Sequence, residues 1–77
     1  MLKIKDGIDL KELEKFGYRD ESHAYEKDMD WQKVCVSKET RTIYWISDDD
    51  YDYVEYGYYG SLVDDLIKSN LVEGVKE

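Results

Sequence analysis

Residues 31–47 read WQKVCVSKETRTIYWIS and contain two runs rich in β-branched and aromatic residues. Such residues favour strands, so Trp31 to Ser37 and Arg41 to Ser47 are predicted to be strands. The polar residues Lys38-Glu39-Thr40 interrupt the pattern between them. The stretch therefore predicts an antiparallel hairpin with a loop of two or four residues.

Both faces of this hairpin are expected to be partly apolar, because side chains alternate between the faces of a sheet. One face would carry Val34, Val36, Ile43 and Trp45. The other face would carry Trp31, Cys35, Tyr44 and Ile46. The first face can pack on helices, whereas the second needs a cover, either residues 18–30 or a second copy of the chain. We therefore expect a homodimer slightly more often than a monomer.

A short helix is predicted over residues 9–16. Asp9 stands at its N-cap position, and Glu12 follows three residues later, which is the spacing of a capping box. Apolar residues at i, i+3 and i+6 would lie near one face, and Gly17 would end the helix. Before it, Leu2 to Ile4 alternates in polarity and predicts a short strand at a sheet edge.

A second helix is predicted over residues 62–72, with Ser61 as its cap. Its apolar residues recur at helical spacing, and Asp64 and Asp65 lie in the first turn, where the helix dipole favours acidic side chains. Asn70 or the region of Gly74 would end it.

The remaining segments carry weaker signals. Residues 18–30 are polar and are predicted to be a loop, with a short strand around Ala24 to Met29. Tyr53 to Tyr58 is predicted to be a third main strand, because tyrosine favours strands. Together these elements predict one α+β domain over residues 1–77, with a mainly antiparallel sheet of three to four strands flanked by two short helices.

The length of the chain limits the classes of protein that it can form. A domain of 77 residues buries only about 60–65% of the surface of its unfolded chain, which leaves little room for a deep active-site cleft. The single cysteine, Cys35, excludes an intramolecular disulfide framework and a thiolate zinc cluster. No apolar run suggests a signal peptide or a membrane span. We expect a cytoplasmic protein that does not bind membranes.

The net charge of −8 is unevenly distributed. Residues 1–47 contain nine Lys or Arg and ten Asp or Glu, while residues 48–77 contain two Lys and nine Asp or Glu. An acidic surface repels nucleic acid phosphates, so direct binding of nucleic acid is not expected. A protein partner with a basic surface is favoured, although net charge also serves solubility alone.

Many of the acidic residues in the C-terminal part of the chain lie in one segment, next to tyrosines. Residues 48–59 read DDDYDYVEYGYY, with five carboxylates, five tyrosines and no Lys or Arg. So many tyrosines cannot all be buried in so small a domain, because each buried hydroxyl needs a hydrogen-bond partner. Tyrosine is also enriched at protein interfaces. The candidate partner-binding residues are Asp48, Asp49, Asp50, Tyr51, Asp52, Tyr53, Glu55, Tyr56, Tyr58 and Tyr59.

No catalytic residue, cofactor or metal site is expected. Asp48, Asp50 and Asp52 have the spacing that begins an EF-hand loop, but the glycine and the final glutamate of that loop are missing. A solvated acidic turn is favoured over a weak cation site. The only histidine, His23, lies in a polar segment without a pattern, and Cys35 lies in a predicted strand, where a thiol usually packs as a small apolar group.

Two stretches at the ends of the chain have a familiar pattern. Residues 4–18 read IKDGIDLKELEKFGY, and residues 62–73 read LVDDLIKSNLVE. They resemble the opening and closing helices of small uncharacterised proteins encoded by phages and prophages of Gram-positive bacteria. The resemblance covers a little over a third of the chain and implies a bacterial host cell. It also implies a role of the kind that small acidic phage proteins often have, binding and inhibiting or redirecting a host protein.

We therefore expect a non-enzymatic, phage-type module that binds a host protein through an acidic, tyrosine-rich surface. One form of inhibition would be nucleic acid mimicry, because side chains two apart on a strand are separated by roughly 6.7 Å, near the spacing of successive phosphates. Asp48, Asp50 and Asp52 would form that track. The alternative is a structural or assembly protein that forms a homo-oligomer.

Overall fold

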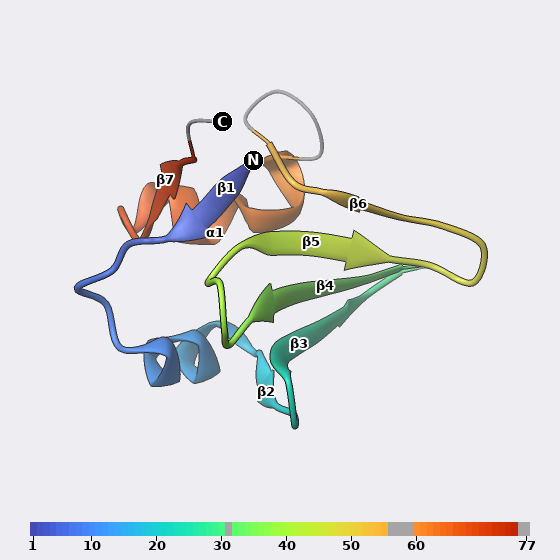
Figure 1. Cartoon of the computed structure of the whole chain (residues 1–77), viewed down its shortest axis with the longest axis horizontal. Coiled ribbons are helices and arrows are strands. Elements are labelled where there is room, and N and C mark those ends of the chain that lie inside the picture. Colours follow the sequence, from blue (N-terminus) through green and yellow to red (C-terminus); the bar gives the residue numbers. More distant parts are fainter. Residues whose placement is uncertain (31, 56–59, 76–77) are drawn as a thin grey trace.

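The computed structural model describes residues 1–30, 32–55 and 60–75. In this part of the chain, the fold combines a five-stranded sheet, a two-stranded sheet and two short helical segments (Figure 1). The predicted class, α+β with mostly antiparallel strands, is confirmed. The number of strands differs from the prediction, and so does the length of the second helix.

The larger sheet has the strand order β2-β3-β4-β5-β6, and each neighbouring pair is antiparallel. Its strands are β2 (Arg19–Asp20), β3 (Ala24–Met29), β4 (Gln32–Ser37), β5 (Ile43–Ile46) and β6 (Tyr51–Tyr53). Because consecutive strands are neighbours throughout, the sheet is a simple meander that begins at β2 and ends at β6.

The central hairpin of β4 and β5 is confirmed. Val34 pairs with Trp45 and Val36 with Ile43, so the four predicted residues share one face. The Ser37 amide donates to the carbonyl of Thr42 at 3.0 Å, which makes 38–41 the four-residue loop. Trp31 lies outside the described residues.

The predicted bounds of two segments next to the hairpin were wrong. The segment 18–30 is not mainly a loop, because it supplies β2 and the full strand β3, of which only the second was suggested by the sequence. It extends the sheet and does not cover it. The third main strand begins at Tyr51 and not at Tyr53, and the predicted part from Tyr56 to Tyr58 lies outside the described residues.

The smaller sheet pairs β1 (Leu2–Ile4) with β7 (Val72–Gly74). The predicted strand at Leu2–Ile4 is confirmed, but its ladder partner is β7. An isolated bridge between Lys3 and Thr42, together with a 2.8 Å bond from the Leu2 amide to the Val54 carbonyl, joins this small sheet to the end of the larger one. β1 is therefore tied to the larger sheet, and β7 is tied to it through β1.

The first helix is a 3₁₀ helix, η1 (Leu10–Phe16). Asp9 caps it by accepting a hydrogen bond from the Lys11 amide at 3.0 Å, and Gly17 ends it with a left-handed φ of 91°. The 3₁₀ form agrees with the spacing of the apolar residues Leu10, Leu13 and Phe16, because side chains three residues apart align in that helix. The predicted short helix is therefore present, in the 3₁₀ form.

The second helical segment is shorter than predicted. It begins as the 3₁₀ turn η2 (Gly60–Val63) and continues as α1 (Asp64–Lys68), which follows Val63 without a side-chain cap. Asn70 has a left-handed φ of 61°, as expected at a helix end. Residues 72–74 then form β7, so the prediction of a helix to residue 72 was wrong, and Val72 faces the core from a strand.

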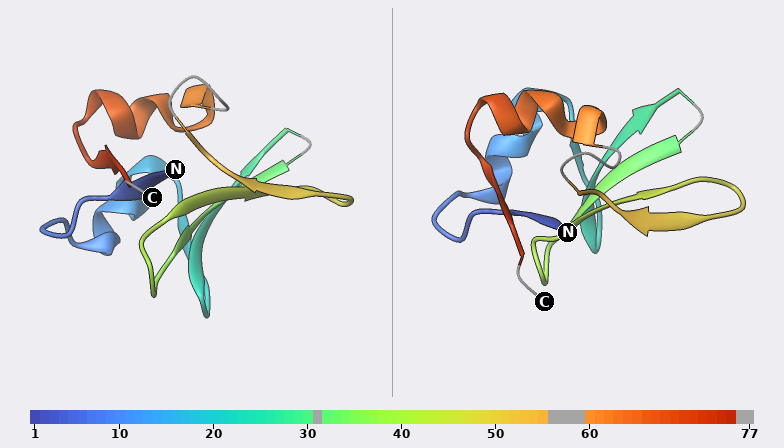
Figure 2. Two further views of the ribbon diagram at one scale, coloured as in Figure 1. Left: turned by 45° about the horizontal axis from the view of Figure 1, so that its top comes forward. Right: turned by 90° about the horizontal axis from the view of Figure 1, so that it is seen from above.

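The hydrophobic core lies between the larger sheet, the helical segments and the small sheet (Figure 2). Val34, Ile43 and Trp45 supply it from the central hairpin, while Leu13 of η1 and Leu66 of α1 are each 0% exposed. We call the sheet face that carries Val34 and Trp45 the inner face. The opposite face, which carries Cys35 and Tyr44, is the outer face.

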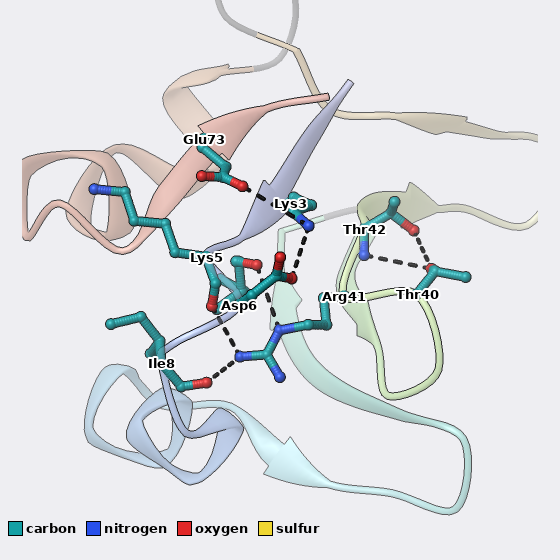
Figure 3. Close-up of polar contacts among 9 residues, drawn as sticks. Lys3, Lys5, Asp6, Ile8, Thr40, Arg41, Thr42 and Glu73 are labelled. Atoms are coloured by element: carbon teal, nitrogen blue, oxygen red, sulfur yellow. Dashed lines mark hydrogen bonds and ion pairs between the residues drawn. The ribbon is translucent and has the colours of Figure 1, made fainter. Parts of the chain in front are cut away.

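Arg41 fastens the loop before η1 to the central hairpin (Figure 3). Its guanidinium donates to the carbonyls of Lys5 at 2.9 Å, Ile4 at 3.4 Å and Ile8. The φ of Arg41 is 66°, a left-handed conformation that a residue other than glycine adopts at a cost. The three hydrogen bonds offset that cost, since they satisfy three backbone acceptors at once.

Candidate interaction surface

The acidic segment lies at one corner of the larger sheet. Asp48 and Asp49 form the bend between β5 and β6, and the Ser47 amide closes this turn by donating to the Asp50 carbonyl at 2.8 Å. The turn lies at the end of the sheet that points away from the helical segments (Figures 1 and 2). Asp48, Asp49 and Asp50 are all exposed there.

The two tyrosines of β6 face the outer side of the sheet. Tyr53 pairs with Tyr44 and Tyr51 pairs with Ile46, and cross-strand partners share a face. Asp52 pairs with Trp45 and therefore stands on the inner face. The tyrosines and Asp52 thus lie on opposite faces of the same strand.

Tyr51 and Tyr53 are unusually open. Their exposed fractions are 69% and 42%, and they are the exposed large hydrophobic residues in the described part of the chain. Both rings can be reached by a partner without any rearrangement of the core. Exposed aromatic side chains on a rigid strand are well suited to a protein interface, because tyrosine supplies a large contact area with few rotatable bonds.

Asp50 and Asp52 bond the backbone amides along the unpaired edge of β6, the edge that does not face β5. The Tyr51 amide donates to Asp50 Oδ1 and the Tyr53 amide donates to Asp52 Oδ1, both at 2.8 Å. These amides point away from β5, because the Val54 amide donates to Ile43 and the direction alternates along an antiparallel strand. The edge amides are therefore already bonded, which disfavours the addition of another strand at this edge.

The negative charge of this corner is not neutralised by the described residues. Asp48, Asp49, Asp50 and Asp52 form no ion pair there, and Glu55 contacts only the N-terminal ammonium group, at 3.0 Å. Most described Lys and Arg side chains contact acids elsewhere, as in the pairs Lys27–Asp65 and Lys33–Glu26. The corner therefore presents a concentrated negative potential to a partner.

A groove of about 520 Å³ crosses the outer face beside this corner. It is lined by three tyrosines and by residues of two turns, namely Ser22, His23, Ser37, Lys38, Glu39, Thr40, Thr42, Tyr44, Tyr51 and Tyr53. Its volume lies within the range of roughly 300–1,000 Å³ that is usual for ligand sites. The sequence did not predict the groove, since it joins the β2–β3 turn to strands that are distant in sequence.

The two ends of the groove differ in character. At the end formed by the turns, polar groups are already paired: Lys38 contacts Asp20, and the hydroxyls of Thr40 and Thr42 lie 2.7 Å apart. At the other end, Tyr51 and Tyr53 present open rings beside the acidic turn. The tyrosine end is therefore the part of the groove that has the most contact area to offer.

Cys35 lies on the outer face of the sheet, beneath the surface. It is 0% exposed, and burial raises the pKa of its thiol to about 11, so it is protonated at neutral pH. Cys35 pairs with Tyr44 across the ladder of β4 and β5, and burial also raises the pKa of Tyr44. Tyr44 in turn pairs with Tyr53 of β6.

His23 lines the groove at its polar end. In residues 1–30, 32–55 and 60–75, no three His, Cys, Asp or Glu side chains come together in an arrangement that could hold a metal ion. Of the candidate partner-binding residues, Asp48 to Tyr53 gather at one corner and Glu55 follows it, whereas Tyr56, Tyr58 and Tyr59 lie outside the described residues.

Comparison of the chain with protein-family models, curated proteins and solved structures found no match. Among the described helices, none has the length and apolar character needed to cross a membrane. The surface geometry is therefore the basis for a functional proposal.

Proposed function

We propose that this protein is a non-enzymatic binding module whose acidic, tyrosine-rich corner engages a basic surface on another protein. We name this surface, Asp48 to Tyr53, the acidic corner. The phage-type inhibitor of a protein in the host cytoplasm, expected from the terminal sequence motifs, is one setting for this activity.

The observation that carries the proposal is the coincidence of unneutralised charge and open aromatic rings. Four aspartates without an ion partner among the described residues lie in the same turn and strand as Tyr51 and Tyr53, which are 69% and 42% exposed. Charges of one sign accelerate the encounter with an oppositely charged partner. Aromatic rings then supply the contact area that holds the partner.

Nucleic acid mimicry is a weaker form of this proposal. Asp48 lies in a bend, Asp50 precedes β6 and Asp52 points to the inner face, so the three carboxylates do not follow one extended strand. The spacing of roughly 6.7 Å applies only to side chains on the same side of a strand. A basic protein surface that does not normally bind a nucleic acid backbone is an equally suitable target.

Self-assembly is the second candidate function. It is favoured by the exposure of Tyr51 and Tyr53 on the outer face, which the segment 18–30 does not cover. Against it stands the electrostatic cost of bringing two acidic corners together, since like charges facing one another at an interface are unfavourable. We therefore rank binding of a basic partner above it.

The proposal is tested by capture from a lysate of a Gram-positive host, followed by binding measurements with each purified candidate. The test variant is Asp48→Asn with Asp49→Asn, which removes two exposed charges whose side chains accept no described hydrogen bond. The matched control is Glu14→Gln with Glu21→Gln. Both are exposed acids in the N-terminal part of the chain, outside the acidic corner. Both variants change the net charge by the same amount.

We expect the test variant to bind the partner roughly fivefold more weakly at low salt, because each exposed ion pair contributes ~0.2–1 kcal/mol. Its affinity should also depend less on salt than that of the unmodified chain. The control should resemble the unmodified chain. A partner that binds the test variant and the control equally well would show that the acidic corner is not the binding surface.

A further inference from the structure

Tyr51 and Tyr53 form a pair with a defined separation. They stand two residues apart on the same face of β6, and both line the groove. Side chains in this relation are separated by roughly 6.7 Å along the strand. A flat group in contact with both rings needs about 7–8 Å, because carbon atoms in contact lie about 3.5–4.0 Å apart. A small outward tilt of the two exposed rings supplies the difference.

We propose that this pair receives the guanidinium group of an arginine from an extended basic segment of the partner, which lies along the groove on the outer face. The inference rests on the proposed function and specifies the partner's chemistry. Tyr51 and Tyr53 contact the two faces of the guanidinium, and the aspartates of the nearby turn supply the negative field that draws it there.

Arginine fits this position better than lysine for two reasons. Its guanidinium is planar and weakly hydrated, so it stacks on aromatic rings at a smaller desolvation cost than an ammonium group. It also presents several N–H donors at its rim, which can reach carboxylates while its faces contact the rings. The tyrosine pair suits the planar faces of the guanidinium, and the aspartates of the acidic turn suit its N–H donors.

The partner segment lies on the face of the sheet and does not extend its edge. The outward amides of Tyr51 and Tyr53 are bonded to Asp50 and Asp52, so they are not free to pair with another strand. The groove instead leads from the tyrosine pair across Tyr44 to the hydroxyl-bearing turns. An extended segment that anchors one arginine between the tyrosines can place its following residues in this groove.

Two synthetic peptides of equal length test the inference, one of alternating glycine and arginine and one of alternating glycine and lysine. Their affinities for the whole protein are measured by calorimetry at a fixed salt concentration. We expect the arginine peptide to bind roughly fivefold more tightly, which corresponds to about 1 kcal/mol, because a guanidinium stacks on the rings at a smaller desolvation cost than an ammonium group. Tyr51→Leu and Tyr53→Leu should remove this preference, and Tyr51→Phe and Tyr53→Phe should keep it.

These variants separate the ring from the hydroxyl and keep the core intact, because both side chains are exposed. Equal binding of the two peptides, or an arginine preference that survives both leucine substitutions, would overturn the inference. In that case a salt-dependent loss with Asp48→Asn and Asp49→Asn would still support the acidic corner as a binding surface. Failure of the proposed function is a different result, in which those two charges have no effect on partner binding.

Discussion

Arg41 shows how a single side chain can set the position of a whole segment. It lies in the loop of the central hairpin, yet its donors reach three carbonyls between Ile4 and Ile8. Its left-handed φ directs the chain so that this reach is possible. This role could not be predicted from the sequence, because an arginine in a polar loop usually points into solvent.

Arg41→Ala should lower the free energy of unfolding by about 2–3 kcal/mol, since hydrogen bonds from a charged donor contribute more than neutral ones. Arg41→Lys should also destabilise the protein, because an ammonium group lacks the planar fork. Urea denaturation measures both. Arg19→Ala serves as the control: Arg19 forms an exposed ion pair with Asp28, whose removal should change stability by less than ~1 kcal/mol. Equal effects of the two alanine substitutions would contradict a special role for Arg41.

Among the elements, those with strong local patterns could be predicted from the sequence. The β4–β5 hairpin has apolar residues at alternating positions in both strands, and only one register places Val34 and Val36 opposite Trp45 and Ile43. η1 has a cap and a glycine at its ends. β2 could not be predicted because it has only two residues, both exposed and charged, and its strand form depends on pairing with β3.

The C-terminal region was misassigned for a related reason. Apolar residues recur at helical spacing up to Leu71, at Leu62, Val63, Leu66, Ile67 and Leu71, which suggested a single helix. The left-handed Asn70 ends the helix, and pairing with β1 makes the following residues a strand. The groove was not predictable either, because turns that are distant in sequence form it, whereas the exposed acidic turn followed directly from composition.

The edge strand β6 leads to a prediction at the scale of elements. Asp50→Ala with Asp52→Ala frees the outward amides of Tyr51 and Tyr53 for pairing with a second chain. Asp50→Asn with Asp52→Asn removes the same charge but keeps an oxygen acceptor at each position. We expect the alanine variant to self-associate more than the asparagine variant in light scattering during size-exclusion chromatography. Equal association of the two variants would mean that charge, and not amide capping, protects this edge.

For the whole molecule, the distribution of charge matters more than its sum. Most described basic side chains are paired with acids elsewhere, so the acidic corner keeps its full negative field. The same field attracts a basic partner and repels a second copy of the chain. Salt therefore acts in opposite directions on the two candidate functions.

This opposition provides the last prediction. If the acidic corner binds a basic partner, raising the salt from about 0.02 to 0.5 M should weaken that complex, because the Debye length falls from more than 20 Å to about 4 Å. If the outer face instead forms a homodimer, the same change should strengthen self-association, because it screens the repulsion between two acidic corners. We expect a monomer at low salt by light scattering, with partner affinity falling as salt rises. A dimer that is stable at low salt and is unaffected by Asp48→Asn with Asp49→Asn would contradict this electrostatic account, since its interface would have to lie away from the corner.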